Sequence, residues 1–204
     1  MKKIFILILL SGLAYPSTYA KEYSISRNIF ILKNGKAKRI IIDDFEKSIV
    51  INFLKWYEKN KKLLHKNRIV KGGGVVGSNY YISSMNKEKY LYELSKSGYL
   101  SNIYIDSLNE YLERCNQNLK KYPQNDGPIQ GLESDIVMKA QDYLGIIENL
   151  DSATIESISK YNNSEDIILT FAKYYKMSFT ITKYNKRWQI DKINGDFPIV
   201  ISHY

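Results

Sequence analysis

The stretch "MSFTITKYNKRWQIDKI", residues 177–193, decides the fold. Polar and apolar residues alternate along it, with Phe179 and Ile181 on one face before the central pair Asn185 and Lys186. A period of two is typical of a half-buried β-strand, and a short polar pair between two such runs is typical of a hairpin turn. The stretch therefore predicts two antiparallel strands joined by a tight turn.

Two earlier segments extend this sheet toward the N-terminus. Residues 154–161 also alternate, Asn162 and Asn163 follow as a turn, and residues 167–174 are apolar and rich in β-prone side chains. Consecutive strands joined by short turns pair in the antiparallel sense. The second half of the chain therefore predicts a meander of three or four strands.

The preceding region carries a helical period instead. Phe45, Ile49, Phe53 and Trp56 follow one another at spacings of four, four and three, after two aspartates that suit a helix start. This spacing predicts an amphipathic helix over residues 43–65, with its lysines mostly in solvent.

Two further helices are expected between this helix and the sheet. Asn86 is placed to cap a short helix that Gly98 ends, and Ser101 is placed to cap a longer helix to about Lys121. The expected buried face of the longer helix consists of Ile105, Leu108, Leu112, Cys115 and Leu119. Cys115 is the only cysteine, so the chain has no internal disulfide.

Helices followed by an antiparallel sheet define an α+β fold. We expect N-terminal helices packed on a curved antiparallel sheet of three to four or more strands, which encloses a cone with a pocket at its open end. Residues 43–204 are expected to form a single domain of ordinary size, preceded by a lead-in segment over residues 21–42.

The first twenty residues have the pattern of a secretory signal peptide. Lys2 and Lys3 precede an unbroken apolar run over residues 4–10, and small residues stand at Thr18 and Ala20. The run is shorter than the roughly 20 apolar residues that span a bilayer, although an uncleaved anchor is the alternative. We therefore expect a soluble periplasmic or secreted protein with no transmembrane segment after signal cleavage.

The chain is basic, with 30 Lys and Arg residues against 21 Asp and Glu residues. Positive charge of this size is common in nucleic-acid-binding proteins. Export separates the protein from nucleic acid, however, and most of the charge is Lys, whereas bidentate phosphate recognition favours Arg. We expect no nucleic-acid partner and only a weak attraction to anionic envelope surfaces.

The sequence contains no convincing catalytic or metal-binding set. His65 and His203 are the only histidines, one in a Lys-rich helix end and one at the C-terminus, so a nucleophile–His pair is not predicted. A hard-metal site of Asp126, Glu133 and Asp135 is conceivable, but an exposed acidic turn is the simpler interpretation. We expect no catalytic residue, no metal and no cofactor.

The glycine-rich segment "KGGGVVGSN", residues 71–79, is interpreted as a flexible connection. It lacks the Lys-Ser/Thr pair of a phosphate-binding loop, and no helix signal follows it.

Gln141 and Asp142 end an otherwise apolar stretch, "SDIVMKAQDY", residues 134–143. A buried carboxylate must be paired or hydrogen-bonded, so Asp142 either turns outward, joins the helices to the sheet through backbone N–H groups, or points into the pocket with a raised pKa. A structural polar clasp is favoured over the pocket.

Aromatic residues at regular spacing are more often core than ligand platform. If the cone is open, however, its pocket candidates are Trp56, Tyr57, Gln141, Asp142 and Tyr143.

Three segments in this order resemble a known family: "NFLKWYEKN" at residues 52–60, "NDGPIQGLESDIVMKAQDY" at residues 125–143 and "FTITKYNKRWQIDKI" at residues 179–193. They are similar to small exported bacterial proteins of unknown function, the YbjP/YqhG-like family. The resemblance implies a cystatin-like or nuclear-transport-factor-like fold and an exported location. Some relatives look lipid-anchored, but here no Cys stands directly after the apolar run of residues 4–10, where it could carry the lipid at a new N-terminus.

Three hypotheses of function remain. The first is a non-enzymatic module that binds a small ligand or an envelope protein partner. The second is a pocket enzyme that uses Asp142 as acid or base. The third is an immunity or inhibitor protein that blocks a periplasmic toxin.

Overall fold

The computed structural model describes residues 28–33, 36–41, 44–74, 77–140, 143–171 and 175–195. The chain divides into two compact units at the bond between Ser48 and Ile49. The first unit contains an antiparallel hairpin of β1 (Asn28–Lys33) and β2 (Lys36–Ile41). The lead-in segment therefore contains paired strands, and the domain boundary predicted at residue 43 stays a prediction.

The second unit is built on a four-stranded antiparallel sheet with the strand order β5-β6-β7-β8. Its strands are β5 (Thr154–Tyr161), β6 (Ser164–Phe171), β7 (Tyr175–Tyr184) and β8 (Arg187–Gly195). Both predicted two-residue turns are present, and Asn185 and Lys186 have the positive φ angles, 47° and 71°, that a type I′ hairpin turn requires. The predicted meander is confirmed.

One face of this sheet forms the core of the second unit. Every second residue of β6 and of the segment 177–181 of β7 is buried on that face, as the period of two predicts. The central members, each at most 1% exposed, are Ile167, Leu169, Phe171, Met177, Phe179 and Ile181. Burial of each such side chain stabilises the fold by about 1.5–3 kcal/mol.

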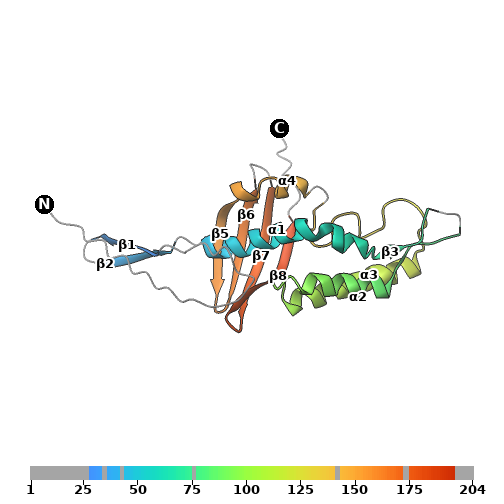
Figure 1. The fold of residues 1–204 in the computed structure, drawn as a ribbon, viewed down its shortest axis with the longest axis horizontal. Helices are drawn as coiled ribbons and strands as arrows, with labels where there is room; N and C mark the ends of the chain where they lie inside the picture. The colour runs from blue at the N-terminus through green and yellow to red at the C-terminus, as the bar shows by residue number, and fades with distance from the viewer. Residues whose placement is uncertain are drawn as a thin grey trace. The chain divides into compact units, whose positions relative to one another are not determined.

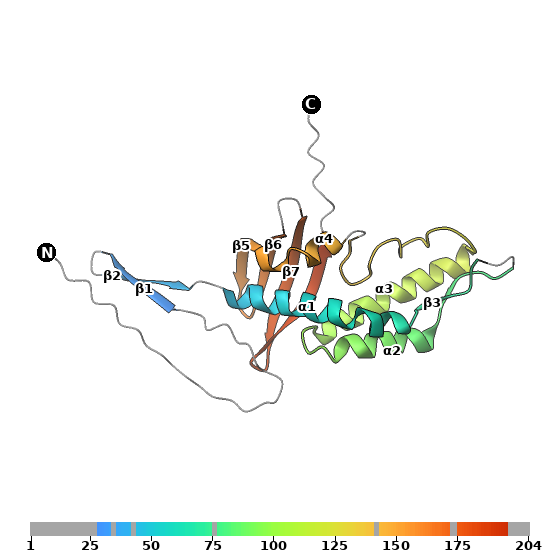
Figure 2. The same ribbon diagram turned by 45° about the horizontal axis from the view of Figure 1, so that its top comes forward.

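Within the second unit, residues 49–66 of helix α1 (Asp44–Lys66) lie across this face of the sheet, as Figures 1 and 2 show. Phe53, Leu54 and Tyr57 of α1 are fully buried. The predicted α+β arrangement, with helices first and an antiparallel sheet after them, is confirmed, and the sheet is open rather than closed into a barrel. Among the described residues, no helix is both long enough and apolar enough to cross a bilayer.

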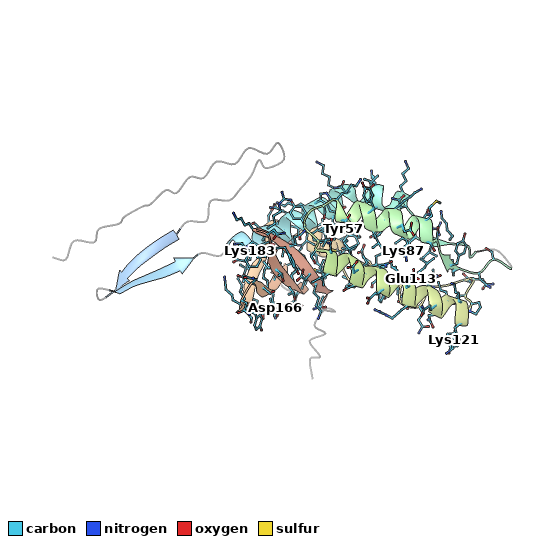
Figure 3. The ribbon with its side chains drawn as sticks, turned by 90° about the horizontal axis from the view of Figure 1, so that it is seen from below. Tyr57, Lys87, Glu113, Lys121, Asp166 and Lys183 are labelled. Carbon is cyan, nitrogen blue, oxygen red and sulfur yellow. The ribbon has the colours of Figure 1, made fainter. Side chains whose placement is uncertain are left out.

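Helices α2 (Ser84–Ser95) and α3 (Asn102–Lys121) pack against each other. Lys87 of α2 and Glu113 of α3 form an ion pair between them, and their side chains point toward one another in Figure 3. The predicted start of α2 is wrong, because Ser83 rather than Asn86 accepts the capping hydrogen bond. The Asn86 side chain instead donates to the Arg68 carbonyl at 2.7 Å.

The predicted face of α3 needs one correction. Tyr104 is buried, whereas Ile105 is only half-buried. The other predicted members of that face, Leu108, Leu112, Cys115 and Leu119, are all buried.

The glycine-rich connection is bounded by a short antiparallel pair, β3 (Val70–Lys71) and β4 (Tyr81–Ile82). This pair contacts α3 through a buried hydrogen bond from the Ile82 N–H to the Asn116 side-chain oxygen, 3.2 Å. The connection is therefore anchored at both ends to the helical part of the unit.

The start of α3 is joined directly to the edge of the sheet. The Ile190 N–H donates to the Tyr99 carbonyl at 2.7 Å, and the Ser101 N–H donates to the Ile190 carbonyl at 3.0 Å. Ser101 then caps α3 by accepting from the Tyr104 N–H at 3.2 Å. The chain therefore continues from a pairing with β8 straight into α3, which places the first turns of α3 beside β8.

Candidate functional site

The structure brings two of the predicted pocket residues together in the core. Tyr57 of α1 is fully buried and Tyr143 is 8% exposed. Their rings meet edge to face with centroids 6.4 Å apart. Trp56 is half-exposed and stacks on Phe53, with centroids 6.4 Å apart. Gln141 and Asp142 lie outside the described residues, so the clasp and pocket hypotheses for Asp142 stay predictions.

A polar clasp does occur in this stretch, but it is formed by Asp135. The Tyr57 hydroxyl donates to Asp135 Oδ2 at 2.7 Å. The other carboxylate oxygen, Oδ1, accepts from the Val137 and Met138 N–H groups at 2.9 and 2.8 Å. Three donors satisfy a half-buried carboxylate, and bonds to a charged acceptor are stronger than neutral ones. Asp135 therefore joins α1 to the turn that begins at Asp135 itself.

This geometry corrects the interpretation of Asp135 as part of an exposed acidic turn. Asp126 and Glu133 are exposed, whereas Asp135 is half-buried and bonded to Tyr57. Within the described parts of the chain, no three His, Cys, Asp or Glu side chains come close enough to hold a metal ion. The hydrogen bonds of Asp135 hold the turn at residues 135–138 to Tyr57 of α1.

Burial keeps the tyrosines around this clasp protonated. It raises the pKa of Tyr57, Tyr90 and Tyr104 well above the ordinary value of 10.0, and the nearby negative charge of Asp135 raises each pKa further. Tyr57, which is labelled in Figure 3, therefore remains a hydrogen-bond donor to Asp135 throughout the physiological pH range.

The residues from Asp135 to Ala140 form a closed turn that several elements hold in place. The Lys139 N–H donates to the Asp135 carbonyl at 2.8 Å, and the Asp135 N–H donates to the Ala140 carbonyl at 3.1 Å. The Tyr104 hydroxyl of α3 donates to the Val137 carbonyl at 3.2 Å. We call residues 135–140 the clasp turn.

The end of β8 also packs against the clasp turn. A Cβ atom added at Gly195 would stand 2.6 Å from the Lys139 carbonyl oxygen and 2.9 Å from that of Met138. Only glycine allows so close an approach between the two backbones. The clasp turn is therefore fixed by α1, by α3 and by β8.

Lys139 occupies a strained position in this turn. Its φ angle is 54°, in the left-handed region that costs a non-glycine residue about 1–2 kcal/mol. Gly or Asn is the usual residue in such a position. Lys186 has the same kind of conformation in a hairpin turn, and residues in such conformations are also enriched at binding sites.

The Lys139 side chain lies in a cleft between α3 and the β7–β8 pair. The cleft has a volume of about 460 Å³, within the range of about 300–1,000 Å³ that is common for small-molecule sites. The Lys139 Nζ atom lies 4.2 Å from the centroid of the Tyr111 ring. The Tyr111 hydroxyl donates to the Gly131 carbonyl, which fixes the ring under the ammonium group.

Asp191 reaches the same cleft through a β-bulge. Thr180 and Ile181 of β7 face Lys192 and Ile190 of β8, so Asp191 is the additional residue between them. Bulges redirect side chains and are common beside functional sites. Asp191 accepts a hydrogen bond from the Tyr184 hydroxyl at 2.9 Å.

The cleft is predominantly positive. Arg114, Lys139 and Lys192 line it, against the single carboxylate of Asp191. Burial lowers the pKa of Lys139, while the nearby Cys115 and Asp135 oppose that effect. No carboxylate of the described residues forms an ion pair with Lys139. A half-buried ammonium group that forms no ion pair with the described carboxylates is a candidate binding group in a cleft.

Sequence reasoning missed Lys139 and Asp191. One signal was available for the turn itself, because an Asp side chain often bonds the backbone N–H groups two and three residues after it. Nothing in the residue pattern indicated a left-handed lysine or the bulge, since both depend on packing between α3 and β8.

The fold defines an α+β protein with helices on an open antiparallel sheet. Comparison with protein-family models, with curated proteins and with solved structures finds no match to this chain. The resemblance to the exported YbjP/YqhG-like family therefore stays a prediction.

Proposed function

We propose that this protein is an exported ligand-binding module whose small-molecule site is the cleft between α3 and β8. The supporting observation is that two structurally unusual positions, the left-handed Lys139 and the bulged Asp191, lie in the same cleft. Each departs from regular geometry, and together they direct opposite charges into one concave surface. Such a cleft, with apolar walls and a few fixed polar groups, is the usual form of a binding site.

Binding is favoured over nucleophilic catalysis by the state of the nearby thiol. Burial raises the pKa of Cys115, which contacts the edge of the cleft through Tyr111, so the unreactive thiol form predominates. His65 is exposed on α1 and is not among the residues that line the cleft. The side chains of the cleft are therefore arranged to hold a ligand rather than to attack one.

The exported location rests on the N-terminal pattern of Lys2, Lys3 and the apolar run that follows. Intact mass measurement of the protein from an exporting host is expected to give a chain that begins near Lys21. A chain that retains all of residues 1–20 would contradict the export proposal while leaving the binding proposal intact.

Native mass spectrometry of the protein purified from the exporting compartment tests the binding proposal. A co-purified small molecule is expected, and the Lys139→Met variant should carry less of it than the Lys120→Met variant, which alters an exposed lysine of α3 outside the cleft. Equal loading of the two variants would contradict the site. A stoichiometric protein in place of the small molecule would instead support the partner-binding or inhibitor alternatives.

A further inference from the structure

The cleft between α3 and β8 has two chemically distinct parts. Its walls include the buried side chains of Tyr104, Leu108 and Ile193, and the exposed Ile103 stands beside them. Its cationic part is formed by Lys139 and Arg114. A ligand that fills this space therefore meets apolar surface along one part and positive charge at another.

The two cations lie against the same aromatic ring. The Lys139 Nζ atom is 4.2 Å and the Arg114 Cζ atom is 6.0 Å from the centroid of the Tyr111 ring. The hydrogen bond from the Tyr111 hydroxyl to the Gly131 carbonyl fixes that ring. Lys139 and Arg114 therefore both line the cleft next to Tyr111, and the fixed ring orders the closer of the two, Lys139, before any ligand arrives.

Among the described residues, Glu110 is the one acid that forms an ion pair with either of these cations. Glu110 approaches Arg114 only to 3.8 Å, and both side chains are largely exposed, so their attraction is weak. Asp191 accepts a hydrogen bond from Tyr184, a residue of the same hairpin. Asp135 uses both carboxylate oxygens within the clasp, as three hydrogen bonds show.

We propose that the cleft binds a small molecule that carries a carboxylate or phosphate group on an apolar body. The anionic group lies against Lys139 and Arg114. The apolar body lies on Tyr104, Leu108 and Ile193. This assignment of the ligand class rests on the proposed function, because it takes the cleft to be a small-molecule site.

Three probes of known structure separate the contributions of charge and apolar surface. Octanoate carries both the anion and the apolar body, octylammonium reverses the charge, and inorganic phosphate lacks the apolar body. The experiment is a titration of the ¹⁵N-labelled protein with each probe, followed by the backbone amide resonances of Tyr111, Lys139 and Ile193 in two-dimensional NMR spectra.

Octanoate is expected to shift these resonances saturably. Octylammonium is expected to bind at least about tenfold more weakly because it brings a positive charge to Lys139 and Arg114. Phosphate is expected to bind at least about tenfold more weakly because it cannot make the apolar contacts of the octanoate chain. Lys139→Met should weaken octanoate binding about tenfold or more. Lys139→Arg, which keeps the charge, should weaken it less. Lys120→Met is the matched control and should leave it unchanged.

The possible failures are distinguishable. If no probe shifts the cleft resonances, the proposed function itself is contradicted. If octylammonium binds as well as octanoate, or Lys139→Met has no effect, the cleft binds small molecules but the anionic class is wrong. If phosphate alone binds as tightly as octanoate, the apolar body is wrong. Unchanged amide dispersion outside the cleft verifies that Lys139→Met is folded, and Lys139→Arg gives an independent comparison if it is not.

Discussion

At the scale of single residues, the most informative group is the Asp135 carboxylate. It accepts hydrogen bonds from Tyr57, Val137 and Met138, so one side chain begins the clasp turn and attaches it to Tyr57 of α1, 78 residues earlier in the chain. The sequence analysis predicted a clasp at Gln141 and Asp142, which lie outside the described residues, and interpreted Asp135 as part of an exposed acidic turn. Periodicity shows where an apolar run ends, but it does not show that the Asp135 carboxylate meets the buried Tyr57 hydroxyl.

Removal of the Tyr57 hydroxyl should destabilise the protein. Tyr57→Phe leaves Asp135 Oδ2 without its donor, and an unsatisfied buried acceptor costs about 1–3 kcal/mol in the free energy of unfolding. Urea denaturation followed by circular dichroism measures this difference. Tyr92→Phe is the matched control, because Tyr92 is 62% exposed and its replacement should change the free energy by less than about 0.5 kcal/mol. Equal effects of the two replacements would show that the clasp contributes nothing.

Because the backbone at Lys139 is strained, we predict that glycine is more stable than alanine at this position, the reverse of the usual order. Glycine normally costs about 0.5–1 kcal/mol relative to alanine in regular structure. At a φ angle of 54°, alanine keeps the unfavourable Cβ contact and glycine removes it. Lys139→Gly should therefore be more stable than Lys139→Ala by about 1 kcal/mol in urea denaturation. If the alanine variant is the more stable of the two, Lys139 is not strained, and the argument from strain to function fails.

At the scale of elements, the sequence predicted the strands and the long helices well. The alternation in residues 177–193 and the two Asn-containing turns were sufficient, because strand period and turn chemistry act over a few residues. Ser101 was predicted correctly as the cap of α3, whereas Asn86 was not the cap of α2. Two residues that can cap a helix, Ser83 and Asn86, lie three positions apart there. The Asn86 side chain donates to the Arg68 carbonyl, and Ser83 forms the cap.

The Ser101 cap should be measurable, because the side chain is buried and accepts from a backbone N–H of the first turn of α3. Ser101 is 2% exposed and accepts from the Tyr104 N–H at 3.2 Å. Ser101→Ala should lower the free energy of unfolding by about 1 kcal/mol. Ser107→Ala, an exposed position inside the same helix, should raise it by a few tenths of a kcal/mol, because alanine is the better helix former. The same sign for both variants would contradict the capping role.

The cleft itself could not be predicted at this scale. Its walls come from α3, the clasp turn and the β7–β8 hairpin, which are separated by long stretches of chain. The bulge at Asp191 and the close approach of Gly195 to Lys139 arise only when these elements pack. Local sequence patterns do not predict contacts between elements that are far apart in the chain.

At the scale of the second compact unit, the buried tyrosines couple stability to alkaline pH. The pKa of Tyr57, Tyr90 and Tyr104 is raised in the folded state, so their contribution to stability is complete below the ordinary tyrosine pKa of about 10. Above that pH the unfolded chain loses these protons and the folded chain does not. The free energy of unfolding should therefore fall by about 1.4 kcal/mol per pH unit for each of these tyrosines.

Spectrophotometric titration of tyrosinate, together with circular dichroism, measures this coupling. Tyr57, Tyr90 and Tyr104 should ionise only as the helical signal disappears, because burial raises the pKa of each in the folded protein. Ionisation of all tyrosines in one step while the helical signal persists would show that these side chains are accessible in the folded protein.

The central claim is that the clasp turn presents Lys139 to a ligand in the cleft between α3 and β8. The most direct measurement is of intermolecular nuclear Overhauser effects between octanoate and methyl-labelled protein. The account predicts effects from the octanoate methylene protons to the methyl groups of Leu108 and Ile193. It predicts none to Leu54, a fully buried residue of α1 that does not line the cleft. Effects confined to methyl groups away from the cleft would contradict it.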